Sequence, residues 1–323
     1  MHIWLHRYIK LVVCCTVLLI AAGGMVTSTG SGLAVPDWPN TYGQFMFSFP
    51  LDKMVGGIYY EHGHRMIAST VGFLTIILAV WTWRVEPRSW VRKLGFGMLG
   101  VVILQGLLGG ITVLFFLPPA VSIGHAGLAQ IFFCLTVTMA LVTSPGWKNT
   151  IEPVDDSTLR RVAAVTTALV YTQIILGATM RHNDAGLAIP DFPLAFGHVL
   201  PPSWNARIGI HFAHRVGALV ATLGVLATAG HVLYHHRMRR DLVRPALALI
   251  LLVAVQVTLG AFVVWSGKNP FINTSHVVNG ALVLGTSLTL TLRTYRIGFE
   301  RLVQPIVARG SDWGLGHGQE ARS

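Results

Sequence analysis

The chain alternates long apolar runs with short polar segments. Eight of the runs reach about 20 residues or more, the length that an α-helix needs to cross the hydrocarbon core of a bilayer. They lie near residues 8–27, 58–83, 93–116, 120–143, 160–180, 207–234, 243–265 and 272–293. This pattern predicts an all-α integral membrane protein with eight transmembrane helices.

The composition supports this prediction, and the placement of charge predicts a topology. Apolar residues make up 53% of the chain and charged residues 11%, far from the composition of an ordinary soluble domain. The basic residues are concentrated on one side of the predicted membrane, at Arg7, Lys10, Arg84, Arg88, Arg92, Lys93, Lys148, Arg160, Arg161, Arg237, Arg239, Arg240, Arg244, Arg293 and Arg296. The other side has only Lys53, Arg181, Arg207 and Lys268.

Positive charge is retained in the cytoplasm, so we expect both termini inside and the loops 28–56 and 182–206 outside. The net charge of +11 then reports topology and gives no reason to expect a nucleic-acid partner. No Arg-rich and Ser-rich transit sequence precedes the first run, which favours a prokaryotic plasma membrane. The three cysteines all lie in apolar runs, so no disulfide framework is expected.

The sequence also repeats itself. The segment 32–39 (GLAVPDWP) returns as 186–193 (GLAIPDFP), with an offset of 190 − 36 = 154. Three further pairs keep nearly the same offset, namely His64-Arg65 with His214-Arg215 (150), Gln105 and Gly109 with Gln256 and Gly260 (151), and His125 with His276 (151). We therefore predict two tandem, pseudo-symmetric four-helix bundles, residues 1–150 and 151–305, followed by a cytoplasmic tail, 306–323. Four spans per copy give both copies the same orientation in the membrane.

Ionisable groups inside a bilayer are costly and usually functional. Glu61 is the only acid within a predicted span, whereas four histidines lie one to two turns inside the outer ends of the even-numbered spans: His64, His125, His214 and His276. A shared depth allows histidines from two facing helices to bind one planar haem from both sides. The spacing recurs in both copies, 125 − 64 = 61 and 276 − 214 = 62 residues, which favours one haem in each half.

Other interpretations of these histidines are weaker. A di-iron carboxylate site needs a second Glu-x-x-His, but the second copy reads His211-x-x-His214 and lacks the oxygen ligands. Zinc accepts four nitrogens, yet it does not explain duplicated pairs. A hydrogen-bonded structural histidine remains an alternative at each single position. Solvated structural roles near the cytoplasmic surface or in the tail are expected for His2, His6, His231, His235, His236 and His317. His182 and His198 lie in the second outer loop, and His62 is left unassigned.

Neighbouring residues add detail to the predicted sites. Arg65 and Arg215 each follow a candidate ligand and could bind a haem propionate with two parallel hydrogen bonds, or could reach toward lipid headgroups. Small residues permit close helix packing and leave room for a macrocycle. The glycines concerned are Gly106, Gly109, Gly110, Gly124 and Gly127.

The two predicted sites differ in one residue. Glu61 lies three residues before His64 and projects from the same helix face, while His211 holds the equivalent place before His214. A buried carboxylate suits proton acceptance or stabilisation of positive charge beside a substrate, which suggests catalysis in the first half and electron relay in the second. A structural ion pair between Glu61 and Arg65, one turn later, is the competing interpretation.

Together, the Glu61-x-x-His64-Arg65 motif, the other histidines, the two GLAxPDxP segments and Asn273-Thr274-Ser275-His276 resemble the haem A synthase family over about residues 5–297. The resemblance implies oxidation of the C8 methyl group of haem O, by successive hydroxylations, to the formyl group of haem A. It also implies that His64 and His125 bind the haem O substrate and haem A product, that His214 and His276 hold haem b, and that Glu61 is catalytic.

The resemblance further implies haem O synthase and cytochrome oxidase assembly factors as partners, although the sequence has no identifiable surface for them. Some bacterial members carry cysteine pairs in the outer loops, and this chain has none there. The strongest rival function is a non-catalytic di-haem b-type cytochrome that relays electrons from quinol, because it explains all four histidines without Glu61. A substrate transporter is a third interpretation.

Overall fold

The computed structural model describes residues 2–148 and 154–296, and within these ranges the chain is helical with no named strand. Eight long helices are present: α1 (His2–Ser28), α2 (Gly57–Val85), α3 (Ser89–Leu114), α4 (Pro119–Thr143), α6 (Ser157–His182), α7 (Ala206–His235), α8 (Arg240–Trp265) and α9 (Pro270–Thr294). Three short elements, η1 (Met46–Ser48), η2 (Leu51–Lys53) and α5 (Pro145–Lys148), lie in connections. The predicted tail, 306–323, lies outside the described residues.

All eight long helices are long and apolar enough to cross a membrane, which confirms the predicted spans. They have 25 to 30 residues each, or about 38–45 Å at 1.5 Å per residue, against about 30 Å of hydrocarbon. The chain is thus a multi-pass membrane protein. α8 begins at Arg240, three residues before the predicted start, so Asp241 lies in its first turn. There Asp241 pairs with Arg239 at 2.9 Å and its carbonyl accepts from Arg293.

Local sequence explains where several helices begin. The side chains of Asp156 and Asn205 accept hydrogen bonds from the N–H groups of Leu159 and Ile208, at 2.8 and 2.9 Å, and so cap α6 and α7. α4 and α9 begin with Pro119 and Pro270, whose fixed φ and missing N–H suit the first helical position. A side-chain cap or a proline therefore marks the start of each of these four helices.

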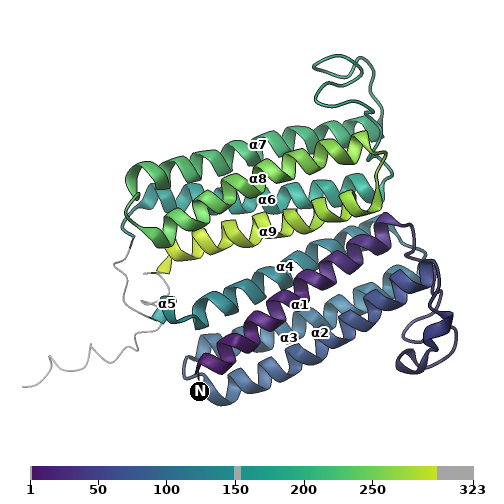
Figure 1. Ribbon diagram of the computed structural model, residues 1–323, viewed down its shortest axis with the longest axis horizontal. Helices are drawn as coiled ribbons and strands as arrows, with labels where there is room; N and C mark the ends of the chain where they lie inside the picture. Colours follow the sequence, from purple (N-terminus) through teal and green to yellow (C-terminus); the bar gives the residue numbers. More distant parts are fainter. Residues whose placement is uncertain (1, 149–153, 297–323) are drawn as a thin grey trace, which may run out of the picture.

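The helices form two groups of four that lie side by side (Figure 1). In the first group α1 packs on α2 and α4, and α3 packs on α2 and α4; in the second, α6 packs on α7 and α9, and α8 packs on α7 and α9. The groups meet through α1 and α4 on one side and α6 and α9 on the other. α4 and α9 are consequently the most buried of the eight helices.

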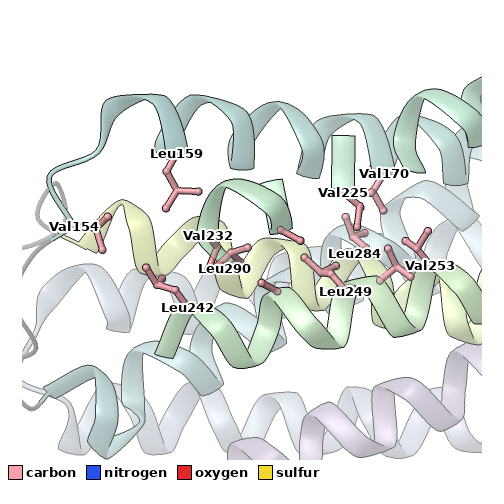
Figure 2. Packing of buried hydrophobic residues seen from close by; sticks show 13 residues of the cluster. Val154, Leu159, Val170, Val225, Val232, Leu242, Leu249, Val253, Leu284 and Leu290 are labelled. Carbon is pink, nitrogen blue, oxygen red and sulfur yellow. The ribbon is translucent and has the colours of Figure 1, made fainter. Parts of the chain in front are cut away.

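Each group has its own apolar core. The core of the second group runs along α6, α7, α8 and α9 and includes Leu159, Val225, Leu249 and Leu284 (Figure 2). The core of the first group runs along α1, α2, α3 and α4, and a smaller cluster of Ile20, Phe133 and Ala281 joins the two groups. Lipid tails are as apolar as these side chains, so close packing rather than exclusion from water holds the helices together.

Small residues and one arginine bring the groups into contact. A Cβ on Gly285 of α9 would lie 2.9 Å from the Phe133 ring of α4, so only glycine allows this approach. At the outer end, Arg181 of α6 donates to the Ser28 hydroxyl at 2.6 Å and to the Gly24 carbonyl at 3.3 Å. The polar contact and the glycine contact place the two groups at a defined separation.

Both outer loops lie at the same end of the helices (Figure 1) and contain the same turn. The Asp37 carboxylate accepts from the N–H groups of Tyr42 and Gly43 at 2.8 and 2.7 Å. The Asp191 carboxylate accepts from Phe196 and Gly197 at 2.7 and 2.8 Å. Tyr42 and Phe196 both have positive φ, 50° and 57°, and a glycine follows each. The repeated segments thus fold alike at these positions.

Candidate functional site

The four candidate histidines lie at similar positions in α2, α4, α7 and α9. They follow the helix starts by 64 − 57 = 7, 125 − 119 = 6, 214 − 206 = 8 and 276 − 270 = 6 residues. At 1.5 Å per residue this is about 9–12 Å from the outer end of each helix. Each group of four helices thus carries two of the candidate histidines at matching depths, and their pairing around a haem stays a prediction.

Each histidine ring rests on a glycine of the preceding helix. A Cβ added to the glycine would lie 3.0 to 3.2 Å from the ring Cε1 atom, so a larger residue would push the ring aside. The four contacts are Gly23 with His64, Gly109 with His125, Gly177 with His214, and Gly260 with His276. Gly109 was expected to pack closely, whereas the sequence analysis missed Gly23 and Gly177. Their offset, 177 − 23 = 154, matches that of the repeated loop segment and could have pointed to them.

The surroundings of the rings fit a haem group. The Nδ1 atoms of His64, His125 and His276 are buried and have no hydrogen-bond partner within residues 2–148 and 154–296. Buried polar atoms of this kind are uncommon and mark strain or a missing ligand. All four histidines nevertheless keep some accessible surface. Each imidazole packs on a glycine and keeps part of its surface accessible. Two imidazoles are a set of axial ligands that iron porphyrin accepts.

The four candidate histidines do not gather at one point. Among the described residues, the one group of three His, Cys, Asp or Glu side chains whose ligand atoms all lie within 4.8 Å is Asp156, His231 and His236. It contains none of the four candidate histidines.

Amide side chains contact three of the rings. Gln105 Nε2 lies 3.3 Å from His125 Nε2, and Gln256 Nε2 lies 3.2 Å from His276 Nε2. Gln173 Nε2 lies 3.0 Å from His214 Nδ1 and donates to the His214 carbonyl at 2.9 Å. The repeat pointed to Gln105 and Gln256 without assigning them a role, and Gln173 was missed because its matching position carries no amide.

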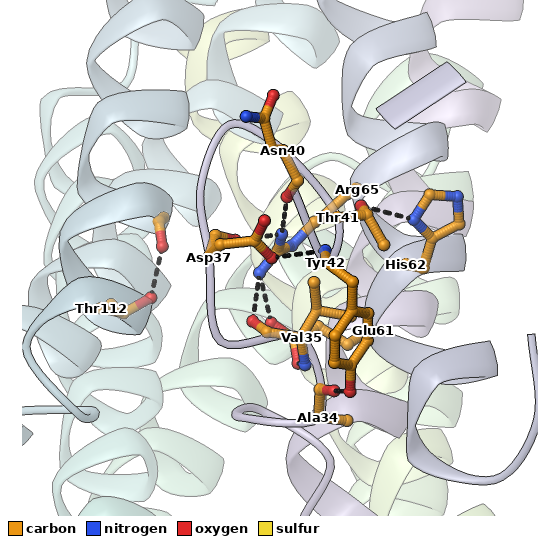
Figure 3. A network of polar contacts seen from close by, with 11 residues as sticks. Ala34, Val35, Asp37, Asn40, Thr41, Tyr42, Glu61, His62, Arg65 and Thr112 are labelled. Atoms are coloured by element: carbon orange, nitrogen blue, oxygen red, sulfur yellow. Dashed lines mark hydrogen bonds and ion pairs between the residues drawn. The ribbon is translucent and has the colours of Figure 1, made fainter. Parts of the chain in front are cut away.

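Glu61 is 3% exposed and is held by the first outer loop and by Arg65 (Figure 3). Its Oε2 accepts from the Val35 N–H and its Oε1 from Arg65 Nη2, both at 2.7 Å. The ion pair with Arg65, which was the alternative interpretation of Glu61, is thus present. The carboxylate still lies one helical turn from His64 on α2.

Arg65 and Arg215 hold the outer loops in place. Arg65 donates to the carbonyls of Val35, Asp37 and Asn40 at 2.8, 2.7 and 3.1 Å (Figure 3). Arg215 donates to the carbonyls of Ile189, Asp191 and Leu194 at 3.2, 2.6 and 2.8 Å. These contacts were not expected, and binding of propionates by the two arginines stays a prediction.

His211 takes the place of Glu61 in the second loop. Its Nδ1 accepts from the Ile189 N–H at 3.2 Å, and the side chain is 3% exposed. His62, which the sequence left unassigned, contacts the Thr41 hydroxyl through Nδ1 at 3.0 Å and so also holds the first loop.

His231 and His236 are more buried than predicted, with side chains 21% and 19% exposed. Both direct Nε2 at Asp156 Oδ2, at 2.8 and 2.9 Å, while Asp156 Oδ1 caps α6. Burial opposes ionisation of Asp156, but the Leu159 N–H and the two imidazoles outweigh it and hold the pKa of the carboxyl below its ordinary value. This cluster ties α6 to the end of α7 far along the helices from the haem candidates.

Comparison with known proteins gives a consistent result. Residues 6–288 match the family described as "Cytochrome oxidase assembly protein". A heme A synthase from Symbiobacterium thermophilum is 33% identical over 258 residues, 76% of this chain and 81% of the relative. Heme A synthases from Geobacillus kaustophilus and Halalkalibacterium halodurans are 29% and 27% identical and cover 86% and 87% of this chain and 88% and 95% of the relatives.

Proposed function

Since the chain belongs to the haem A synthase family, we propose that it oxidises the C8 methyl group of haem O, by successive hydroxylations, to the formyl group of haem A. Its relatives make it an enzyme of haem A biosynthesis, and the specific reaction is our proposal. The observation that carries it is that four half-buried histidines, two in each group of helices, each rest on a glycine, with a buried acid one turn before the first of them only.

The proposal divides the chain into residues 1–150 and 151–305 with different roles. His64 and His125 bind haem O as substrate and haem A as product. His214 and His276 hold haem b, which supplies one-electron transfer when bound. Support comes from the two candidate histidines that each group of helices carries at matching depths, and from the sequence difference between Glu61 in the first half and His211 in the second.

Glu61 is the proposed catalytic residue. It lies one turn from His64 on α2, and in this buried setting its carboxylate stabilises positive charge that develops at the methyl carbon of the substrate or accepts a proton from it. Arg65 holds Glu61 in one orientation through the 2.7 Å ion pair. In this role Arg65 positions the acid, and contacts to propionates from Arg65 and Arg215 would come in addition.

We also propose a prokaryotic plasma membrane location with both termini in the cytoplasm and the four histidines toward the outer face, an orientation that the one-sided placement of basic residues supports. The substrate carries a long apolar tail and reaches the protein from the bilayer. By its chemistry haem O comes from an enzyme that attaches this tail, haem O synthase, and haem A passes to the assembly factors of cytochrome oxidase.

A test must separate the synthase from a non-catalytic di-haem cytochrome relaying electrons from quinol. We would express the full chain with and without a source of haem O, extract the haem and identify it by chromatography and mass. The synthase accumulates formyl-bearing haem only when haem O is supplied, and a cytochrome accumulates none. Glu61→Gln should keep both haems and lose conversion, whereas full conversion by this variant would remove Glu61 from the mechanism.

A further inference from the structure

A separate group of side chains that can bind a metal lies at the end of the helices away from the outer loops (Figure 1). Asp156 caps the start of α6, His231 lies near the end of α7, and His236 directly follows α7. Both imidazoles direct Nε2 at Asp156 Oδ2, at 2.8 and 2.9 Å. One ligand atom from each of the three residues lies within 4.8 Å of the other two, a spacing that a single ion can bridge.

The two imidazoles converge because α7 ends between them. Residues five apart on a continuous helix point about 140° away from each other around the helix axis, at about 100° per residue. His236 leaves the helix, with φ −126° and ψ 27°, while its N–H still donates to the Val232 carbonyl at 2.8 Å. This change of direction brings its ring to the carboxylate oxygen that the His231 ring also meets.

The start of α6 orients the carboxylate toward the two rings. Asp156 Oδ1 accepts from the Leu159 N–H at 2.8 Å, so Oδ2 is the oxygen that faces the imidazoles. Among the described residues, the ion-pair partners of Asp156 are the two histidines, without a lysine or arginine. With neutral imidazoles the cluster therefore carries one negative charge, which favours a bound cation.

The first group of helices closes the corresponding end in another way. The offset of 150 that relates α7 to α2 places Trp81 opposite His231, since 231 − 150 = 81. The same offset places Glu86 opposite His236, and Glu86 follows α2 as His236 follows α7. Glu86 pairs with Arg88 at 2.6 Å. The four-helix unit therefore does not need two imidazoles at this end, and the three convergent ligands belong to the second half alone.

We propose that Asp156, His231 and His236 form a binding site for a divalent transition-metal ion of the class of Zn²⁺ and Fe²⁺. Two imidazole nitrogens and one carboxylate oxygen are a ligand set that both ions accept, whereas Mg²⁺ and Ca²⁺ prefer oxygen ligands. Three protein ligands leave at least one position for water. The ion joins the start of α6 to the end of α7, and the site contains none of the proposed haem ligands.

Binding requires a small opening of the cluster. Ligand atoms in a tetrahedral zinc site lie about 3.3 Å apart, because each is about 2.0–2.1 Å from the ion. The present N···O separations have hydrogen-bond lengths, so each ring must withdraw by about 0.5 Å. The side chains of Asp156, His231 and His236 are 18%, 21% and 19% exposed, which leaves them free to make this shift. Each ring then carries its proton on Nδ1 and offers the lone pair of Nε2 to the ion.

The test uses the full-length protein with its haems, purified in detergent through an affinity tag that contains no histidine. After EDTA treatment and dialysis, binding of Zn²⁺, and of Fe²⁺ without oxygen, is measured by equilibrium dialysis and elemental analysis. We expect one ion per chain beyond the haem iron, with Zn²⁺ bound more tightly than Fe²⁺. Either ion should raise the midpoint of thermal unfolding, because it binds the folded protein, and Mg²⁺ should not.

Asp156→Asn is the sharpest variant, because asparagine still accepts from the Leu159 N–H and caps α6 as well as aspartate does. Residues outside the ligand set typically change metal affinity about 10–100-fold, so loss of a ligand in Asp156→Asn or His236→Ala should weaken binding by at least about 100-fold. His235→Ala is the matched control and should bind like the wild type. His235 is exposed, lies between the two ligands in the sequence and is not part of the group.

X-ray absorption at the zinc edge identifies the ligands independently of affinity. The wild-type spectrum should show two imidazoles at about 2.0–2.1 Å from zinc. Wild-type protein that binds neither ion, or binding and melting responses that Asp156→Asn and His236→Ala leave unchanged, would overturn this inference. The cluster would then be a hydrogen-bonded cap only. Haem extraction tests the proposed function separately, so either result leaves that function as it stands.

Discussion

The two outer loops are held by the same arginine contacts, yet only the first is also held by a carboxylate from the helix that follows it. Arg65 and Arg215 each donate to three loop carbonyls, and each loop has one further N–H that needs an acceptor. In the first loop the acceptor is the Glu61 carboxylate, and in the second it is the His211 imidazole. A histidine thus accepts the loop hydrogen bond in the second half that the acid accepts in the first. The loop does not require a carboxylate, which favours a chemical role for Glu61.

Replacing Glu61 by histidine, the residue that the second half has at this position, should have the largest effect. Glu61→His retains an acceptor for the Val35 N–H, as His211 does for Ile189, so we expect the fold and both haems to persist. Conversion of haem O should fall about 10²–10⁴-fold, the usual contribution of an acid or base. Haem extraction measures it. The reciprocal His211→Glu should leave conversion unchanged, and conversion by Glu61→His at the wild-type rate would mean that the acid is structural.

Removing Arg65 should destabilise the protein more than removing Arg215. Arg65→Ala leaves Glu61 buried without its counter-charge, which costs about 3–5 kcal/mol. Arg215→Ala leaves no buried acid without a partner, because the nearby Asp191 carboxylate keeps two N–H donors of its own turn, and the lost hydrogen bonds should cost about 1–3 kcal/mol. Thermal unfolding in detergent compares the two variants. The double variant Glu61→Gln/Arg65→Ala should recover part of the loss, and equal effects of the two single variants would contradict the charge argument.

The glycines beneath the histidines offer an equal perturbation of both sites. Gly23→Ala and Gly177→Ala each place a Cβ 3.0 Å from a ring Cε1 atom, an overpacking that typically costs about 1–3 kcal/mol. We expect each variant to lose haem from its own pair, measured as the haem-to-protein ratio. Gly72→Ala, where a Cβ meets nothing within 4 Å, is the control. Loss of haem from the opposite pair would show that the rings do not act locally.

The smallest expected effect is the response of the two turns to acid. Burial opposes ionisation of Asp37, but the N–H groups of Gly43 and Tyr42 and the nearby Arg65 outweigh it and lower its pKa below 3.8. The Gly197 and Phe196 N–H groups likewise lower the pKa of Asp191. Each carboxylate therefore stabilises its turn above about pH 4, and this contribution is lost as the pH falls through the lowered pKa.

Hydrogen-exchange protection of the Gly43 and Gly197 amides should accordingly fall together below about pH 4. In Asp37→Asn the first turn should show less protection at neutral pH and lose its acid response, while the second turn keeps it. Protection that is independent of pH in both turns would contradict the assignment.

Much of the architecture could be predicted because the bilayer imposes simple rules. A spanning helix needs a long apolar run, and an ionisable residue inside such a run stands out. Eight runs therefore gave eight helices, and His64, His125, His214 and His276 were recognisable as candidates. The equal spacing in the two halves of the chain predicts that their rings pair, and this pairing stays a prediction.

The contacts that surround the candidates were less predictable. Arg65 and Arg215 were expected to bind a haem propionate or reach toward lipid headgroups, but besides the Glu61 carboxylate their hydrogen-bond partners are loop carbonyls, which any residue can supply and no sequence pattern marks. His231 and His236 were expected in solvent, and they meet Asp156 only because α6 and α7 lie side by side.

The sequence by itself determined the membrane spans, the repeated segments and the depth of the four histidines, since each depends on composition and spacing along one helix. Only the tertiary structure decided which glycine lies beneath each ring and that Asp156 meets the imidazoles of His231 and His236. The physical reason is that these contacts join different helices. Their distances depend on how closely the helices pack, and a linear pattern does not encode that separation.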